Sequence, residues 1–396
     1  MMTALGHIMF WGGLLSLLHT YLFYPLLLKL LARGKAEQLP PTEEWPEVFI
    51  IMSAYNEERV IEEKMASLSA QEYPEGRLQI LVGSDCSDDG TNRLAAAWAG
   101  REPRLSFFPY TQRRGKPEVI NELAQEARRR ASSPDYILII TDASVMMEPG
   151  TARRLAARFA DPGVGLVDSH IKHTGMQRAG ISEAENTYIS GEVLLKHREG
   201  LAWGCMMGPF GGCYALRGRY FSPVPSTFLV DDFYITMRLF EQGGRAVSAL
   251  DALCYEAVSH DIREEFRRKV RISAGNFQNL KAFRHLWWPP FGRLGFAFFS
   301  HKVLRWLGPF ALIALLAGTA LLALGGNLFY QLLFGLLAGG MLLLPPLDQL
   351  LHRWQIDWLP VRGARYFLAM NRALLAGFYK YLKGVRTNVW QPTKRN

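Results

Sequence analysis

The sequence is poor in cysteine and shows no cysteine pattern. Its 396 residues contain four cysteines, and no two of them form a C-x-x-C pair. A disulfide framework or a structural zinc site requires paired or clustered cysteines. The spacing therefore indicates reduced thiols in a cytosolic domain. The four residues are Cys86, Cys205, Cys213 and Cys254.

Two phosphate-binding fingerprints are also missing, and the chain has no internal repeat or low-complexity tract. There is no G-x-G-x-x-G motif, which opens dinucleotide-binding folds, and no G-x-x-x-x-G-K-[ST] motif, which forms a P-loop. The first absence argues against a Rossmann dinucleotide site. The second excludes a P-loop kinase or ATPase.

Charge is scarce near the N-terminus. Residues 4–31 carry no charge before Lys29, and this run exceeds the ~20 residues that span a bilayer. A secretory signal is the alternative, but the run is too long, its cations follow it and no A-x-A cleavage site appears. We therefore predict a transmembrane helix whose cytoplasmic flank carries Lys29, Arg33 and Lys35.

The C-terminal part has further apolar runs. Residues 303–324 and 328–347 predict two more membrane spans. Residues 366–382 are long enough to span, but an asparagine, an arginine and a lysine make insertion costly, so this run either spans or lies on the surface. We expect a multi-pass protein of the inner cell membrane with three parts, an N-terminal helix (1–35), a cytoplasmic domain (36–285) and interfacial and transmembrane helices (286–396).

Positive charge is abundant, with a formal net charge of +9. Such a balance suits nucleic acid, an anionic membrane surface or anionic substrates. The basic residues adjoin the predicted membrane spans and form no RRM, KH or helix-turn-helix pattern. We therefore expect membrane lipid as a partner, and no nucleic acid.

Between the apolar ends, short apolar runs alternate with amphipathic segments. The predicted strands are residues 48–52, 78–84, 105–108, 136–141 and 164–170. The predicted helices are residues 57–71, 91–98, 116–130, 181–201, 233–242 and 262–283. Strand–helix alternation predicts an α/β fold with a doubly wound, mostly parallel sheet.

The strand at residues 136–141 ends abruptly in Asp142, with Ser144 two residues later. Ligands of open α/β sheets bind at the carboxyl ends of the strands. A carboxylate there can hold a divalent cation, which in turn can hold a diphosphate. The alternative is that Asp142 is an ordinary polar turn residue.

Seven short motifs in a fixed order carry a family resemblance. Over about residues 46–285 the chain resembles a family 2 glycosyltransferase, which implies the GT-A nucleotide-sugar-binding fold. With its apolar ends it is similar to the membrane-embedded synthases of chitin oligomers, hyaluronan and poly-N-acetylglucosamine. The motifs are Ala54–Glu57, Ser84–Thr91, Arg114–Lys116, Thr141–Ser144, Gly211–Gly212, Asp231–Asp232 and Arg268–Arg271.

The resemblance implies roles on the donor side. Asp85 would contact the uracil or ribose, Glu57 would support the nucleotide, and Lys116 would approach the nucleotide or its phosphates. Asp142 would be the first carboxylate of a D-x-D motif that binds Mg²⁺ or Mn²⁺. Ser144 replaces the second carboxylate, which removes one negative charge from the predicted metal site.

It also implies roles on the acceptor side. Asp232 would be the general base, and Asp231 is a weaker candidate. Because both carboxylates precede the helix predicted at residues 233–242, the alternative is a helix cap. Gly211 and Gly212 would allow close backbone approach beside the acceptor, and the alternative is an ordinary loop.

Arg268 and Arg271 stand where the family has its Q-x-x-R-W motif, and would bind the leaving diphosphate. This chain has Arg268 for glutamine and Ile272 for tryptophan. The missing tryptophan disfavours a long-chain processive enzyme. Alternatively, this basic helix binds anionic lipid. Diphosphate binding and lipid binding are compatible, because they would use different faces of the helix.

The resemblance implies an inverting hexosyltransferase at the cytoplasmic membrane face. It would transfer sugar from a UDP-sugar to a growing or lipid-linked glycan for surface polysaccharide. One alternative is a non-processive enzyme that adds a single sugar to a polyprenyl-linked acceptor. Another is a catalytically idle membrane scaffold, which would be expected to have lost Asp142, Asp232 or Arg271.

Overall fold

The computed structural model describes residues 2–37, 44–174, 181–257, 262–354, 356, 358–385 and 388. The chain divides into two compact units. The helical unit comprises Met1–Leu31, Gln177–Leu195 and Phe266–Lys383, and the sheet unit comprises Ala32–Met176, Lys196–Glu265 and Gly384–Asn396. Packing units need not be independently folding domains, so the domain bounds at residues 35 and 285 stay predictions.

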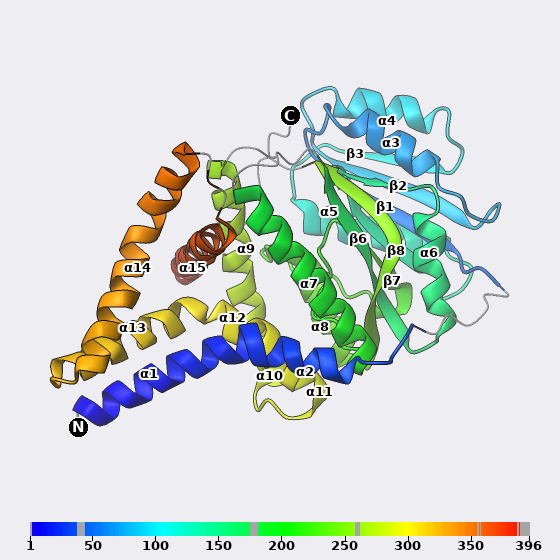
Figure 1. Cartoon of the computed structure of the whole chain (residues 1–396). Helices are drawn as coiled ribbons and strands as arrows, with labels where there is room; N and C mark the ends of the chain where they lie inside the picture. Colours follow the sequence, from blue (N-terminus) through cyan, green and yellow to red (C-terminus); the bar gives the residue numbers. More distant parts are fainter. Residues whose placement is uncertain are drawn as a thin grey trace. The chain divides into compact units, whose positions relative to one another are not determined.

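The sheet unit is built on one eight-stranded sheet in the order β3-β2-β1-β4-β7-β6-β8-β5. Strands β3, β2, β1 and β4 are parallel, β7 runs antiparallel to β4 and β6, and β8 is parallel to β6 (Figure 1). The strands are β1 (Val48–Ala54), β2 (Leu78–Asp85), β3 (Leu105–Tyr110), β4 (Ile137–Asp142), β5 (Val145–Met147), β6 (Val164–Thr174), β7 (Cys213–Arg217) and β8 (Arg245–Ala257). The predicted α/β class is confirmed.

Helices cover both faces of the sheet. On β2, Ile80 and Val82 belong to the same buried cluster as residues of α3, α4 and α6. Gly83 points the opposite way, where an added Cβ would lie 2.6 Å from Val119 of α5. This alternation explains why the strands are apolar on both faces. The helices are α3 (Ile61–Ser69), α4 (Thr91–Ala99), α5 (Lys116–Arg130), α6 (Thr151–Ala157) and α8 (Asp231–Glu241).

Two helix starts differ from the prediction. Helix α3 begins at Ile61 instead of residue 57. The Glu57 and Glu58 amides donate to Thr91 Oγ1, in the first turn of α4, and to Asp89 Oδ2, in the loop before it. Helix α8 begins at Asp231 instead of residue 233. Strands β5, β7 and β8 were not predicted.

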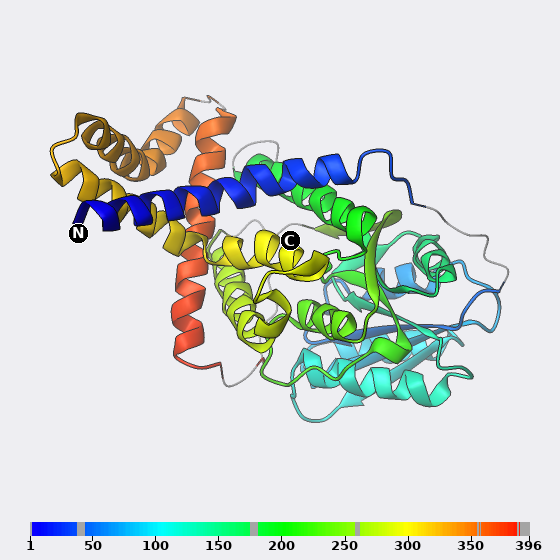
Figure 2. The same ribbon diagram turned by 90° about the horizontal axis from the view of Figure 1, so that it is seen from below.

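The helical unit collects the apolar ends of the chain. Helix α1 continues through a π-helical turn into α2, so that residues 2–31 form one long helix (Figure 2). Helix α7 begins in this unit and passes into the sheet unit at Lys196. The elements are α1 (Met2–Leu18), η1 (His19–Phe23), α2 (Tyr24–Leu31), α7 (Ile181–Trp203), α9 (Ile262–Ala282), α10 (Arg284–Trp287), α11 (Gly292–Phe298), η4 (Phe299–Val303), α12 (Leu304–Trp306), α13 (Gly308–Leu324), α14 (Leu328–Arg353) and α15 (Leu359–Leu382).

Among the described residues, two helices are long and apolar enough to cross a membrane, Met2–Leu31 and Leu328–Leu351. The predicted span at residues 303–324 is broken instead of continuous. Segments Gly292–Trp306 and Gly308–Leu324 meet at 65°, and count as a third candidate only if the bent pair is one span. Pro309 stands in the first turn of α13 and cannot donate the N–H of a continuing helix. Helix α15 is not among the candidates.

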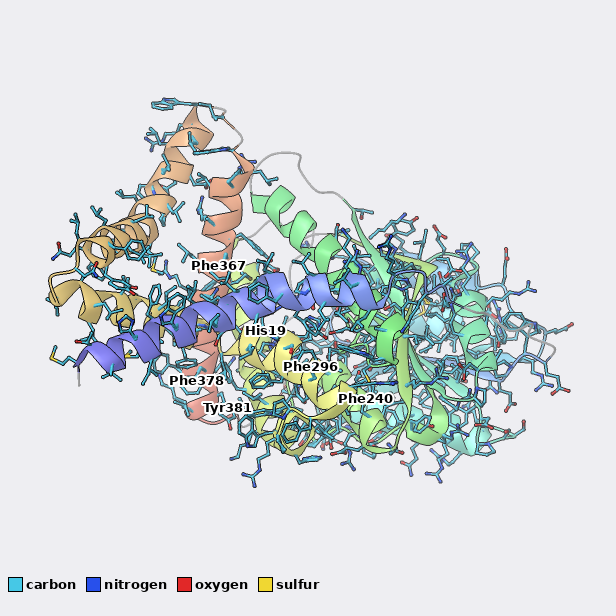
Figure 3. The ribbon with its side chains drawn as sticks, turned by 60° about the horizontal axis from the view of Figure 1, so that its bottom comes forward. His19, Phe240, Phe296, Phe367, Phe378 and Tyr381 are labelled. Carbon is cyan, nitrogen blue, oxygen red and sulfur yellow. The ribbon has the colours of Figure 1, made fainter. Side chains whose placement is uncertain are left out.

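Polar and aromatic contacts bind the helical unit together. His19 Nε2 lies 2.8 Å from Ser300 Oγ, and its ring meets Phe296 edge to face with centroids 5.9 Å apart (Figure 3). Glu192 of α7 accepts from Lys302 Nζ at 2.8 Å and also pairs with Arg305. These contacts fix α7 and the η4–α12 segment against each other within the unit.

Candidate functional site

The carboxyl ends of three parallel strands form one edge of the sheet unit. In the β1–β4 register Ser53 faces Asp142, and in the β1–β2 register Ala54 faces Ser84. The predicted polar loops therefore emerge side by side. A cleft opens at this edge, lined by Ser53, Tyr55, Glu57, Asp85, Arg113, Gly115, Lys116, Asp142, Ala143 and Ser144.

The loops after β1 and β2 are locked together. Asn56 Nδ2 donates to Asp88 Oδ1 at 2.6 Å, and the Asp88 amide donates back to Asn56 Oδ1 at 3.1 Å. Asn56 and Cys86 both adopt positive φ, at 52° and 59°. Such conformations cost free energy in residues other than glycine and often occur at functional sites. The locked pair gives Glu57 and Asp85 fixed positions at the cleft.

Asp85 organises the loop before α5. Its Oδ1 accepts the Arg114 amide at 2.7 Å, and its Oδ2 accepts the Gly115 amide at 2.9 Å. Gly115 has φ +91°, a conformation that favours glycine. In this structure the carboxylate contacts loop amides, and its contact with a uracil or ribose stays a prediction.

Lys116 lies between two carboxylates. Its Nζ is 2.7 Å from Asp142 Oδ1 and 3.4 Å from Asp231 Oδ2, and its side chain is 20% exposed. Burial alone would lower the pKa of Lys116, but the Asp142 and Asp231 carboxylates outweigh it and raise the pKa. The ammonium is therefore a permanent positive charge at the cleft.

Asp142 and Ser144 could hold a metal ion only together with further ligands. Asp142 is 38% exposed, and one of its oxygens is engaged by Lys116. The Ser144 hydroxyl donates to Glu256 Oε1 at 3.4 Å. No group of three or more histidine, cysteine or acidic residues in the described part of the chain could hold a metal. These ligands fit Mg²⁺ or Mn²⁺ that arrives with a diphosphate, since Mg²⁺ often takes one or two carboxylates together with phosphates.

Asp231 and Asp232 lie in the first turn of α8, and Val230 occupies the cap position without a side-chain bond. Neither carboxylate is therefore the cap, although both gain from the positive end of the helix. Asp232 Oδ1 accepts the Phe233 amide at 2.7 Å. Burial raises the pKa of Asp232 to about 6, the Asp231 charge adds to the rise, and Lys116 opposes it. A carboxyl with a pKa close to neutral suits a general base.

Gly211 and Gly212 connect the two carboxylate positions. A Cβ on Gly211, which has φ +86°, would lie 2.4 Å from Asp232 Oδ2. The carbonyl of Gly212 accepts the Asp142 amide at 2.9 Å. One glycine-rich segment thus touches both Asp232 and the end of β4. A side chain at Gly211 would displace Asp232, and one at Gly212 would meet Ile171 and Val145.

The structure therefore brings most of the predicted residues to one edge of the sheet. Arg268 and Arg271 belong to α9 in the helical unit, and their contact with a diphosphate stays a prediction.

Several residues at this edge were missed. Lys64 is fully buried on α3, and its Nζ donates to Thr141 Oγ1 at 2.9 Å and to the Val145 carbonyl, which holds the turn that carries Asp142. Burial lowers the pKa of Lys64 to about 8. Its signal was a lysine within the apolar stripe of the predicted helix, three residues after Ile61. Arg113 was also missed. Its guanidinium lies 3.4 Å from the centroid of the Tyr55 ring. Nothing in the sequence marked it except its position directly before the Arg114–Lys116 motif.

Comparison with known families gives two overlapping matches. Residues 49–217 match the family model described as Glycosyl transferase family 2. Residues 136–345, more than half of the chain, match Glycosyl transferase family group 2.

Two curated relatives are N-acetylglucosaminyltransferases. The Mesorhizobium japonicum protein is 27% identical over 265 residues, which cover 62% of this chain and 60% of that protein. The Rhizobium leguminosarum bv. viciae protein is 26% identical over 308 residues, which cover 71% of this chain and 69% of that protein.

A similar solved structure is the mannosyltransferase from Pyrobaculum calidifontis in complex with GDP-Man and Mn²⁺. It superposes with a TM-score of 0.70 at 24% identity, covering 96% of this chain and 99% of that one. The likeness confirms the GT-A fold.

The Asp85 contacts generate a prediction about the loop before α5. Asp85→Asn replaces one acceptor oxygen by an N–H₂ group, which would face a backbone N–H. Hydrogen bonds to charged groups contribute about 1.5–3 kcal/mol, so UDP affinity should fall roughly tenfold to a hundredfold if the loop binds nucleotide. Calorimetry in detergent measures this. Glu75→Gln removes a carboxylate at an exposed turn and serves as the control; equal affinities in both variants would refute the role.

Proposed function

We propose, because this chain belongs to the family 2 glycosyltransferases, that it transfers a sugar with inversion from a UDP-sugar to a growing or lipid-linked glycan. One observation carries the proposal. The Gly211–Gly212 segment lies against Asp232 on one side and binds the Asp142 amide on the other. A candidate base and a candidate diphosphate site are thus joined through two residues.

The donor would bind in the cleft by its diphosphate. Lys116 and Arg113 line the cleft and supply positive charge. Asp142 would hold Mg²⁺ or Mn²⁺, which when bound balances negative charge on the leaving group. N-acetylglucosamine is the first sugar to test, because the relatives carry the name N-acetylglucosaminyltransferase.

Asp232 would act on the acceptor. Its carboxylate takes the proton of an acceptor hydroxyl while that oxygen bonds to C1 of the sugar. The bond between C1 and the diphosphate oxygen breaks, and its electron pair leaves with UDP. Attack opposite the leaving group inverts the configuration at C1, so one base is sufficient.

The acceptor is the open part of this proposal. Ile272 stands in place of the family's tryptophan, which favours addition of one or a few sugars over long-chain synthesis. A polyprenyl-linked acceptor is therefore the nearest alternative. An idle scaffold is disfavoured, because Asp142, Asp232 and Arg271 are all present. A panel of UDP-sugars and GDP-Man, read as nucleotide release from membranes, tests the activity.

We also propose that the sheet unit faces the cytoplasm of a multi-pass membrane protein. Helix Met2–Leu31 is apolar enough to span, and Lys29, Arg33 and Lys35 follow its core. In a Cys205→Ser background, Cys86 should react with a membrane-impermeant maleimide only after cells are opened. Cys86 is partly exposed in the loop after β2. Labelling of Cys86 in intact cells would contradict this orientation.

Asp142 carries the metal prediction. Asp142→Asn should make Mn²⁺ or Mg²⁺ ineffective and lower sugar transfer by at least about a hundredfold, since metal charge stabilisation amounts to several kcal/mol. Ser144→Ala removes only a hydroxyl and should lower sugar transfer by a smaller factor. Transfer is measured with and without a chelator. An Asp142→Asn variant that keeps the parent rate in chelator would contradict the metal site.

Asp232 carries the base prediction. Asp232→Asn should slow transfer by about 10² to 10⁴, the usual contribution of a general base, and leave UDP affinity nearly unchanged. Asp231→Asn is the matched comparison and should lose less. Transfer rate and UDP calorimetry are measured on both variants. Parent-like transfer by Asp232→Asn, or collapse of its UDP binding, would show that Asp232 is not the base.

A further inference from the structure

A second buried lysine lies on the acceptor side of the site. Lys196 of α7 is 4% exposed, and its Nζ lies 3.7 Å from the centroid of the Phe210 ring. A cation above an aromatic face is attracted by the ring, but burying an ammonium still costs free energy. Within the described part of the chain, Lys196 forms no direct ion pair with a carboxylate. The cost of burying this ammonium suggests that its charge serves a function.

Phe210 and Gly211 connect Lys196 to two carboxylates. The Phe210 amide donates to Asp168 Oδ2 at 3.2 Å, and Asp168 is 2% exposed on β6. Gly211, the next residue, lies against Asp232 Oδ2. Lys196, Asp168 and Asp232 are thus arranged around the same two residues of the glycine-rich segment.

The titratable groups around Asp232 come from five elements. Asp231 lies on α8, Lys116 on α5, Lys196 on α7, Asp168 on β6 and the buried phenol of Tyr214 on β7. Burial raises the pKa of Asp232 to about 6, and Asp231 adds to the rise, whereas Lys116 and Lys196 lower it. Burial raises the pKa of Asp168 to about 7, and Lys196 opposes this rise too. Without these lysines, neighbouring buried carboxyl groups would tend to retain a proton.

We propose that Lys196 is a positioning residue for the base: its ammonium, seated on the Phe210 ring, keeps Asp232 ionised and ready to accept the acceptor proton. The inference rests on the proposed role of Asp232. It also assigns different roles to Lys116 and Lys196. Lys116 is bound to Asp142 and faces the donor cleft, so a bound diphosphate would compete for its charge. Lys196 is outside the cleft lining and remains available to Asp232.

The test compares pH profiles of kcat/KM for sugar transfer. Lys196→Met removes the ammonium and keeps a long apolar side chain. A nearby opposite charge favours the ionised form of a carboxyl, so removing the ammonium should move the acidic limb to higher pH. Near pH ~5.5 transfer should fall by about threefold or more, and near pH ~8.5 it should stay within about twofold of the parent.

Two control variants accompany Lys196→Met. Lys196→Arg keeps the positive charge and should keep the parent pH profile. Lys172→Met removes an exposed lysine from β6 and should leave the profile unchanged. UDP affinity should be the same in all three, because none of these residues lines the cleft.

A Lys196→Met variant that loses the same factor at every pH, or loses nothing, would overturn the inference. If Lys196→Met does not fold, Lys196→Gln decides. It also removes the ammonium but keeps a polar side chain, so the acidic limb should again move to higher pH; an unchanged limb or a shift to lower pH would overturn the inference. The proposed function is tested separately. If the parent protein transfers sugar and Asp232→Asn abolishes transfer, the proposed function stands whatever Lys196→Met shows. A parent protein that transfers no sugar contradicts the proposed function itself.

Discussion

The charge balance at the carboxyl ends of β1, β2 and β4 is the constraint on which the site depends. Asp142, Asp231 and Asp232 converge there, and like charges that are partly buried together repel each other. The Lys116 ammonium, 2.7 Å from Asp142 and 3.4 Å from Asp231, offsets this repulsion. The same ammonium lines the cleft. A group that stabilises the folded site is therefore also a cation that a diphosphate can meet.

The fold positions Lys116 through the start of α5. Asp85 accepts the Arg114 and Gly115 amides, so the chain enters the helix in one conformation. Gly83 has no side chain, which lets Val119 of α5 approach β2 closely. The amino end of a helix attracts anions, because its first N–H groups point outward. Loop, helix end and lysine thus direct positive charge to the same point.

The pattern of apolar and polar residues along the sequence predicted the elements of the sheet unit that follow one another directly in the chain. The first four strands and the bounds of α5 follow from apolar runs bounded by polar loops. Strand β7 was missed, because it directly follows two glycines and pairs antiparallel with strands that are distant in the sequence. Lys196 and Asp168 were missed for a similar reason. Asp168 meets the Phe210 amide 42 residues away, a contact that only the folded chain creates.

The configuration of the new glycosidic bond tests the central claim most directly, since one base at Asp232 and in-line attack require inversion. The purified protein would be given an α-linked UDP-sugar and an acceptor, and the anomeric proton of the product would be read by NMR before any equilibration. The account predicts a β-linked product. An α-linked product would mean retention, and would contradict a mechanism with Asp232 as a single base.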